Sequence, residues 1–331
     1  MYFDDVKRAS HGPLSAQMKA SPRLMGGVGR PPPPRRGGSM RRHQTRTAYT
    51  FLLVPLIFYL IVRFLPTLSA LRLSLFDWNI LKDTQPFVGT ENYQRLFADE
   101  KFGQALRNTA LYTVIGVPAQ IALGLIVALL LNKIIALRGL FRALYFAPYV
   151  TPIVAAAWVW QWLFSPQFGP VNTFLIWLHI TPQNFLNSPD QALATTAALV
   201  VWQNLGFQIV LFLAGLSAIP RSYYEAAEID GANGTQAFWK ITWPLLNPTI
   251  VFSVVTGTIS YLQLFTQVVN LNFTDQGGPL GSTTTVALYI YQIAFGRFQM
   301  GYASAITVVL FLIILTITLF QLRFLTRRYD L

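Results

Sequence analysis

The stretch 222–244 carries the densest group of residues that could perform work for the protein. Three of the 13 acidic residues fall within six positions of it, beside two alanines and two glycines. These residues are Glu225, Ala226, Ala227, Glu228, Asp230, Gly231 and Gly234. Alanine lets another protein approach a helix closely, and glycine permits a sharp bend because it has no Cβ atom. The pattern predicts a short helix, a bend at Gly231 and a second helix at the inner membrane face, shaped to fit a groove in a partner.

The charge of this stretch favours a protein partner over a lipid surface. An amphipathic segment that rests on headgroups carries Lys and Arg on its polar face, whereas this one carries Glu225, Glu228 and Asp230. Anionic lipid would repel these carboxylates. We expect a side chain at Gly231 to block the bend, and we expect Pro244 to help restart the chain as a helix.

Polar side chains inside apolar segments form a second group, and such groups tend to mark function because they are costly in lipid. A path for an uncharged polar solute needs amides and hydroxyls that match the solute's hydrogen-bonding groups, and aromatic faces that pack on its apolar parts. The candidates are Trp202, Gln203, Asn204, Gln208, Tyr261, Gln263, Gln267 and Asn270, with Trp158, Trp160 and Gln161 in an earlier segment. Each one alone is better explained by helix–helix hydrogen bonding or interfacial anchoring. The two later segments together favour a cavity for an uncharged solute.

Several kinds of chemistry are missing from the sequence. There are no cysteines, which excludes disulfides, thiolate metal sites and cysteine nucleophiles. The three histidines are too widely spaced for a metal site, so we expect no metal. We find no set of catalytic groups in an apolar segment and no Gly-x-x-x-x-Gly-Lys-Ser/Thr loop. We therefore expect no catalytic residue and no nucleotide hydrolysis by this chain.

Composition indicates that lipid covers much of the protein. The chain is 53% hydrophobic and 11% charged, whereas soluble domains are about 25% charged. Six segments approach the ~20 apolar residues needed to cross a bilayer. They are 47–65, 108–132, 143–164, 191–220, 248–271 and 298–322. The expected fold class is all-α, a polytopic membrane protein with six transmembrane helices.

The amino-terminal tail, 1–46, is strongly basic. It holds ten Lys/Arg and two Asp/Glu, so it contributes +8 of the formal +12. Its Pro, Gly, Ser and Arg content predicts disorder. No aromatic residues interleave with the charges, so a solvated leader is favoured over a lipid or nucleic-acid surface. A start at Met40 is an alternative in which 1–39 is not translated. Lys and Arg in the short loops place both termini in the cytoplasm.

The spacing from 225 to 244 resembles a known signature. Glu225-Ala226-Ala227 is followed after three residues by Gly231, then by Ile241 and Pro244. This is similar to the cytoplasmic signature of binding-protein-dependent ATP-driven import permeases, with Trp243 in place of the usual Leu. Other stretches resemble the carbohydrate branch and its first permease subunit, of the maltose and glycerol-phosphate type. They are Arg107-Asn108-Thr109, Pro148 and Pro152 with Trp158, Gly169-Pro170-Val171-Asn172, Gly277-Gly278-Pro279, and Gly301-Tyr302-Ala303-Ser304-Ala305.

The resemblance implies a type I ABC importer permease fold in a bacterial inner membrane. It divides the chain into a tail (1–46), a first helix with its outer loop (47–104), a five-helix permease domain (105–325, with a coupling loop at 219–248) and a second tail (326–331). It also implies a second permease subunit as a heterodimer partner, two ATPase subunits that bind ATP and Mg²⁺, and a solute-binding protein. This chain would bind no cofactor itself. Its coupling residues would be Glu225, Ala226, Ala227, Asp230, Gly231, Ile241 and Pro244.

An ion-coupled secondary carrier for an uncharged solute is the main alternative. Such carriers need ionisable groups inside the membrane. The five later apolar segments have none in their centres, which counts against this alternative. An intramembrane enzyme is a more distant alternative, since no set of catalytic groups lies at depth.

Overall fold

The computed structural model describes residues 38–82, 84–133, 138–271 and 276–326, with side chains from residue 44 on except those of Lys133 and Arg138. These residues are mostly helical, and the model has two isolated β-bridges among them, Phe76 with Phe87 and Asn79 with Gln299. The chain divides into two compact units, Met1–Tyr59 and Leu60–Leu331.

Helix α1, Gly38–Tyr59, is the described part of the first unit. Residues 38–46 are therefore helical, where the sequence predicts disorder. They are the first turns of a helix that the apolar stretch after them propagates, and Met40, Arg41 and Arg42 have good helix propensity. The rest of the predicted disordered tail, and most of the alternative that starts at Met40, lies outside the described residues.

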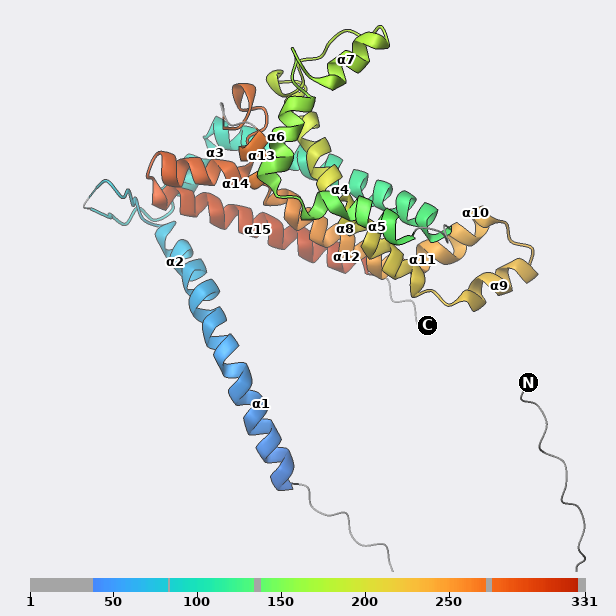
Figure 1. The fold of residues 1–331 in the computed structure, drawn as a ribbon. Helices are drawn as coiled ribbons and strands as arrows, with labels where there is room; N and C mark the ends of the chain where they lie inside the picture. The colour runs from blue at the N-terminus through green and yellow to red at the C-terminus, as the bar shows by residue number, and fades with distance from the viewer. Residues whose placement is uncertain (1–37, 83, 134–137, 272–275, 327–331) are drawn as a thin grey trace, which may run out of the picture. The chain divides into compact units, whose positions relative to one another are not determined.

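The second unit begins with a π-helical turn, Leu60–Phe64, and helix α2, Leu65–Leu73. The bundle that follows consists of α4 (Glu100–Lys133), α8 (Ala192–Ser217), α12 (Asn247–Leu262) and α15 (Met300–Leu325). Helix α4 packs against α8 and α12, and α12 packs against α15 (Figure 1). Helix α5, Arg138–Val150, lies directly against α8. A Cβ added at Gly206 of α8 would collide with the Tyr145 carbonyl oxygen and lie 2.8 Å from Phe146 Cα.

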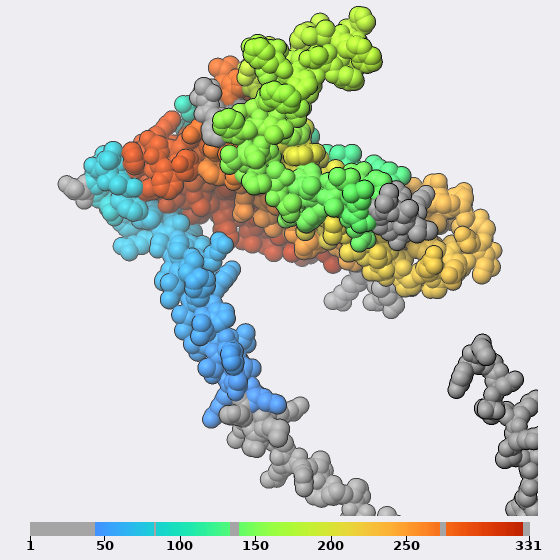
Figure 2. All heavy atoms as spheres, in the orientation of Figure 1, coloured from blue at the N-terminus to red at the C-terminus, as the bar shows by residue number. Residues whose placement is uncertain are grey.

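Among the described residues, four helices are long and apolar enough to cross a membrane, and six crossings result if each of two bent helix pairs crosses once. The prediction of one helix over 143–164 is wrong. Helix α5 ends at Val150, and α6, Ile153–Leu163, continues at an angle of 95°. Pro152 lacks a backbone N–H and disfavours helical geometry at the preceding residue. Helix α6 leads away from the α4–α8 pair towards α7, Pro170–Trp177 (Figures 1 and 2).

Several other boundaries differ from the sequence prediction. The fifth span ends at Leu262, and a separate short helix, α13, follows at Thr266–Leu271. Helix α14, Val286–Tyr291, with a π-helical turn at Gln292–Gly296, occupies a region expected to be loop. The expected domain boundary at 104/105 falls inside α4. Of the tail 326–331, only Thr326 is described. The remaining short elements are 3₁₀ turns at Phe185–Asn187 and Pro279–Gly281.

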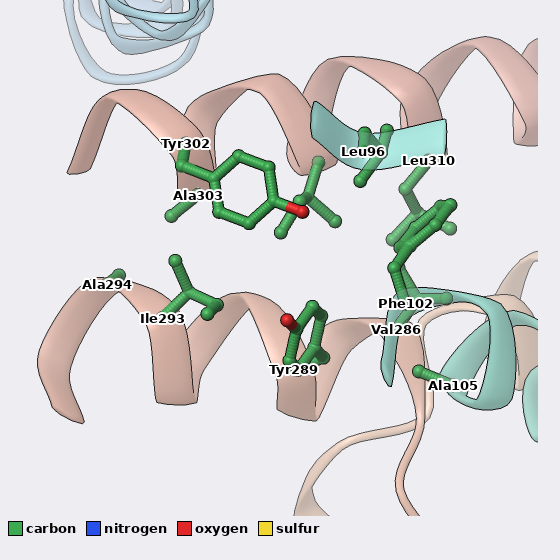
Figure 3. Packing of buried hydrophobic residues seen from close by; sticks show 11 residues of the cluster. Leu96, Phe102, Ala105, Val286, Tyr289, Ile293, Ala294, Tyr302, Ala303 and Leu310 are labelled. Carbon is green, nitrogen blue, oxygen red and sulfur yellow. The ribbon is translucent and has the colours of Figure 1, made fainter. Parts of the chain in front are cut away.

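One end of the bundle, called the α3 end here, has its own apolar core. Helix α3, Glu91–Phe97, meets the start of α4, α14 and the start of α15 there. Tyr289 of α14 and Tyr302 of α15 face each other across this core (Figure 3). Their hydroxyl groups both donate to Asp99 Oδ2 at 2.6 Å. Asp99 Oδ1 also accepts from the backbone N–H groups of Lys101, at 3.0 Å, and Phe102, at 3.3 Å. The single carboxylate thus caps α4 and joins it to α14 and α15.

These hydrogen bonds also set the charge state of Asp99. Partial burial acts to raise its pKa, but the bonds from Tyr289, Tyr302 and the two backbone amides outweigh burial and lower the pKa below 3.8, the usual value. The Arg95 guanidinium lies 4.2 Å from the centre of the Tyr302 ring and donates to Gln299 Oε1 at 3.0 Å. The α3 end is therefore held by an ionised, hydrogen-bonded carboxylate.

The close contact at Gly206 generates a stability prediction. We expect Gly206→Ala to lower the free energy of unfolding by about 1–3 kcal/mol, because the new methyl group meets backbone that cannot rotate away. Gly103→Ala in α4 is the matched control, since no atom lies within 4 Å of its added Cβ. Thermal unfolding of the detergent-purified protein measures both. A Gly206→Ala protein that melts at or above the wild-type temperature would contradict the packing described here.

The Asp99 contacts generate a pH prediction. Because the folded-state pKa is lowered, the stabilisation is complete above the unfolded pKa of about 3.9 and is lost as pH falls through the folded value. We expect Asp99→Asn to flatten the loss of melting temperature between about pH 5 and pH 3. Asp99→Ala should lower the free energy of unfolding by about 1 kcal/mol at pH 7, because the cap of α4 is lost. Asp77→Asn, at an exposed aspartate, should leave the pH profile unchanged.

Candidate functional site

The acidic loop forms two short helices separated by a bend, as its sequence predicts. Helix α9 covers Arg221–Ile229 and α10 covers Gly234–Ala237. Gly231, between them, has φ of +73°, in the left-handed region that favours glycine. Asn233 caps α10: its side chain accepts from the Gln236 N–H at 2.9 Å, and the Gln236 side chain accepts from the Asn233 N–H at 2.9 Å.

The reason that glycine is required at the bend differs from the expected one. No atom lies within 4 Å of a Cβ placed on Gly231, so the prediction that a side chain would block the bend is wrong. The constraint is conformational, because an L-residue costs about 1–2 kcal/mol in left-handed backbone geometry.

Helix α9 is anchored on one side and exposed on the other. The Tyr224 hydroxyl makes a 2.9 Å hydrogen bond with the Thr242 hydroxyl. Tyr224 and Phe238 also pack on a core built from α4, α8 and Leu246. The rest of the helix exposes Glu225, Ala226, Glu228, Ile229 and Asp230 to the surroundings, with Ile229 86% exposed. The loop lies at one end of the bundle (Figure 2), and these exposed residues are one large apolar side chain, an alanine and three carboxylates.

The chain from α10 into the membrane contains the remaining signature residues. A π-helical turn, Phe238–Thr242, holds the half-buried Ile241. Helix α11, Trp243–Leu245, holds Pro244 and leads into α12 at a bend of 62°. Trp239 and Trp243 are partly exposed and, with Phe324 and Leu325 at the end of α15, line a groove of about 420 Å³. The loop is therefore continuous along the chain with α12.

Some of the polar candidates for a solute path come together near the middle of the bundle. Gln267 of α13 donates to Gln203 of α8 at 3.2 Å. The Trp202 ring lies 5.7 Å from the ring of Trp160 in α6. Gln161, next to Trp160, donates to the Leu271 carbonyl at 2.6 Å, at the end of α13. Helices α6, α8 and α13 thus bring amides and indole rings into one region.

The other candidates serve packing in this conformation. Gln208 is 3% exposed and accepts from the Ser253 hydroxyl at 2.7 Å, which joins α8 to α12. Tyr261 is 1% exposed, and its ring fills the space beside Gly116. Asn204 and Asn270 donate to carbonyls one turn back in their own helices, at 2.9 and 2.7 Å. Gln263 is exposed just beyond the end of α12.

Two partners of the candidate residues were missed by the sequence reasoning. Thr242 anchors Tyr224, and Ser253 pairs with Gln208. Each is a small hydroxyl residue within a largely apolar stretch. A hydroxyl in such a stretch indicates a buried hydrogen bond, and this was the only sign of the pairing in the sequence. Neither could be assigned a partner, because the pairing residue lies 18 positions away for Thr242 and 45 for Ser253.

Comparison with known proteins agrees with this geometry. Residues 120–330 match the model of the family described as "Binding-protein-dependent transport system inner membrane component". The sulfoquinovosyl glycerol transport system permease protein SmoG of Agrobacterium fabrum is 38% identical over 237 residues, 72% of this chain and 76% of SmoG. The lactose transport system permease protein LacF of Rhizobium radiobacter is 36% identical over 296 residues, 88% of this chain and 97% of LacF.

A solved structure has the same fold. A chain of a bacterial ABC transporter involved in import of the acidic polysaccharide alginate superposes with a TM-score of 0.74 at 24% identity, covering 86% of this chain and 96% of that chain. This likeness confirms the predicted fold class, and the ion-coupled carrier gains no support. The chain is a multi-pass membrane permease and belongs to the family of inner membrane components of binding-protein-dependent transport systems.

Proposed function

We propose that this chain is the permease subunit of an ATP-driven importer for a sugar or sugar-like solute. The observation that supports the solute class most directly is the Gln203–Gln267 pair, which lies in the region of the Trp160–Trp202 ring pair. A primary amide offers a donor and an acceptor to a sugar hydroxyl. Indole rings offer flat apolar faces to a sugar ring. The relatives named for sulfoquinovosyl glycerol and lactose transport support the same solute class.

The loop at 219–248 is proposed to couple transport to ATP hydrolysis on a partner. Glu225, Ala226 and Asp230 form the exposed contact surface, and Gly231 sets its shape. The Tyr224–Thr242 bond and the core beneath it hold α9 to the segment that enters α12. Force on α9 therefore moves α12 relative to α8, and with it the solute region. ATP and Mg²⁺ would bind to two ATPase subunits, because this sequence has no phosphate-binding loop.

The remaining partners follow from the same proposal. A second permease subunit would complete the pathway as a heterodimer, and a solute-binding protein would deliver the solute on the side opposite α9. One alginate importer structure was solved in complex with a pentasaccharide-bound periplasmic protein, which supports such a partner. The Lys and Arg of the loops on the α9 side support a cytoplasmic location for both termini.

The bend at Gly231 tests the coupling role. We expect Gly231→Val to reduce solute uptake and solute-stimulated ATPase activity of the assembled transporter about 5- to 30-fold, because the left-handed conformation becomes 1–2 kcal/mol less favourable. Membrane insertion should be normal. Gly234→Ala is the matched control: no atom lies within 4 Å of its added Cβ and its backbone is helical. Equal uptake by the two variants would refute the role assigned to the bend.

A comparison of two hydrogen-bonded pairs tests the solute region. Replacing both members of a buried pair with apolar groups is nearly neutral for folding. We expect Gln203→Leu with Gln267→Leu to keep the melting temperature but lower uptake about tenfold, since each lost hydrogen bond to the solute is worth ~1 kcal/mol. Gln208→Leu with Ser253→Ala should preserve both the melting temperature and the uptake. Uptake is measured with a sugar that a ligand screen on the binding protein identifies. Full uptake of that sugar by Gln203→Leu with Gln267→Leu would rule out the proposed path.

A further inference from the structure

A recess lies where α4 ends, α5 begins and α8 ends. It consists of two adjoining hollows that share Arg142, Leu213 and Ser217. The smaller hollow, about 50 Å³, is completed by Leu131 and Asn132 and is mostly polar. The larger, about 190 Å³, runs along α8 and is mostly apolar. A guanidinium therefore lies at the junction of a polar and an apolar compartment.

The charge of Arg142 is not balanced by neighbouring residues. Within the part of the chain that the structure describes, its guanidinium makes no ion pair and no hydrogen bond. The sequence has no Asp or Glu between Glu100 and Asp190, a stretch that covers α4 after its first residue and all of α5, α6 and α7. This surface is suited to an anion that comes from outside the chain.

The position of the recess indicates which anion. Helix α4 has 34 residues, about 51 Å at 1.5 Å per residue, against a hydrocarbon core of ~30 Å. Helix α8 has 26 residues, about 39 Å. Both helices are therefore longer than the hydrocarbon core. Because the charge-free stretch of α4 ends at Asn132, just before Lys133, we infer that the last turns of α4 and α8 reach the headgroup layer. Arg142 belongs to that layer, whereas the apolar hollow lies next to it along α8, towards the membrane centre.

We propose that this recess binds one anionic phospholipid. The guanidinium fork of Arg142 matches a phosphate through two parallel hydrogen bonds. An acyl chain lies along Val210, Leu213 and Ala214 in the larger hollow. A soluble anion would use the polar hollow alone and leave the apolar one empty. Basic recesses between transmembrane helices on the cytoplasmic side are suited to lipid headgroups.

The bound lipid would lie beside the apolar core that holds the acidic loop. Leu213 belongs to the core that also contains Leu216 and Leu246, on which Tyr224 of α9 packs. The recess thus adjoins the core that anchors the acidic loop, and it is separate from the Gln203–Gln267 region. We infer that the bound lipid stabilises the α5–α8 contact at that end of the bundle.

The test is lipid retention by the assembled transporter in nanodiscs of phosphatidylcholine with 0–30 mol% phosphatidylglycerol, followed by detergent extraction and native mass spectrometry. Wild-type protein should retain one phosphatidylglycerol in preference to phosphatidylcholine. Arg142→Ala should lower this preference about fivefold, as expected for one surface arginine, while Arg142→Lys should retain part of it. Arg323→Ala, at an exposed arginine in the last turn of α15, is the matched control and should retain the lipid fully.

The outcomes separate the proposal from its rivals. Unchanged phosphatidylglycerol retention in a folded Arg142→Ala transporter would overturn it. Displacement of the lipid by inorganic phosphate alone would also overturn it, and would indicate a site for a free anion. Weakened association of the ATPase subunits with unchanged lipid would overturn it in favour of a protein contact. The melting temperatures of Arg142→Ala and Arg142→Lys, compared with that of the wild type, establish that both variants are folded.

Discussion

The hydrogen bond between Tyr224 and Thr242, with the apolar core beneath it, is the connection that holds the acidic helix α9 to the bundle. Helix α9 is short and exposed, and a nine-residue helix has little stability by itself. Its position is determined by this contact with the segment that enters α12. Because α12 packs on α4, α8 and α15, one small anchor connects the acidic surface to the whole bundle. Without this contact, α9 could change its position without changing that of α12.

Two glutamines of α8 show how the same side chain is used for packing and for recognition. Gln203 and Gln208 are five residues apart, which places them about 140° apart around the helix. Gln208 faces α12 and accepts from Ser253, so its carbonyl is satisfied within the bundle. Gln203 faces α13 near the indole rings of α6 and α8, and its partner is another amide. A pair of amides retains further donor and acceptor capacity, which a solute can use.

The two ends of the bundle are built on different physical principles. At the α3 end, the Asp99 carboxylate is surrounded by four donors and joins α4 to α14 and α15. At the α9 end, the carboxylates of α9 and Arg142 are exposed, and within the described part of the chain no comparable network surrounds them. The first arrangement joins the helices firmly. The second leaves the charged groups at the surface.

The membrane class, the all-α fold class and the approximate positions of the apolar segments follow from the amino-acid sequence alone, because the length of an apolar run acts locally. The bend at Gly231 follows from it as well, since the bend needs only a residue that tolerates positive φ. That Pro152 divides the third segment by 95° became clear only from the folded structure, since Pro148 in the same segment remains inside a helix. Tertiary structure also selected the partners of Gln203, Gln208, Asp99 and Thr242, because each bond joins residues from different helices whose facing surfaces are fixed only when the whole bundle packs.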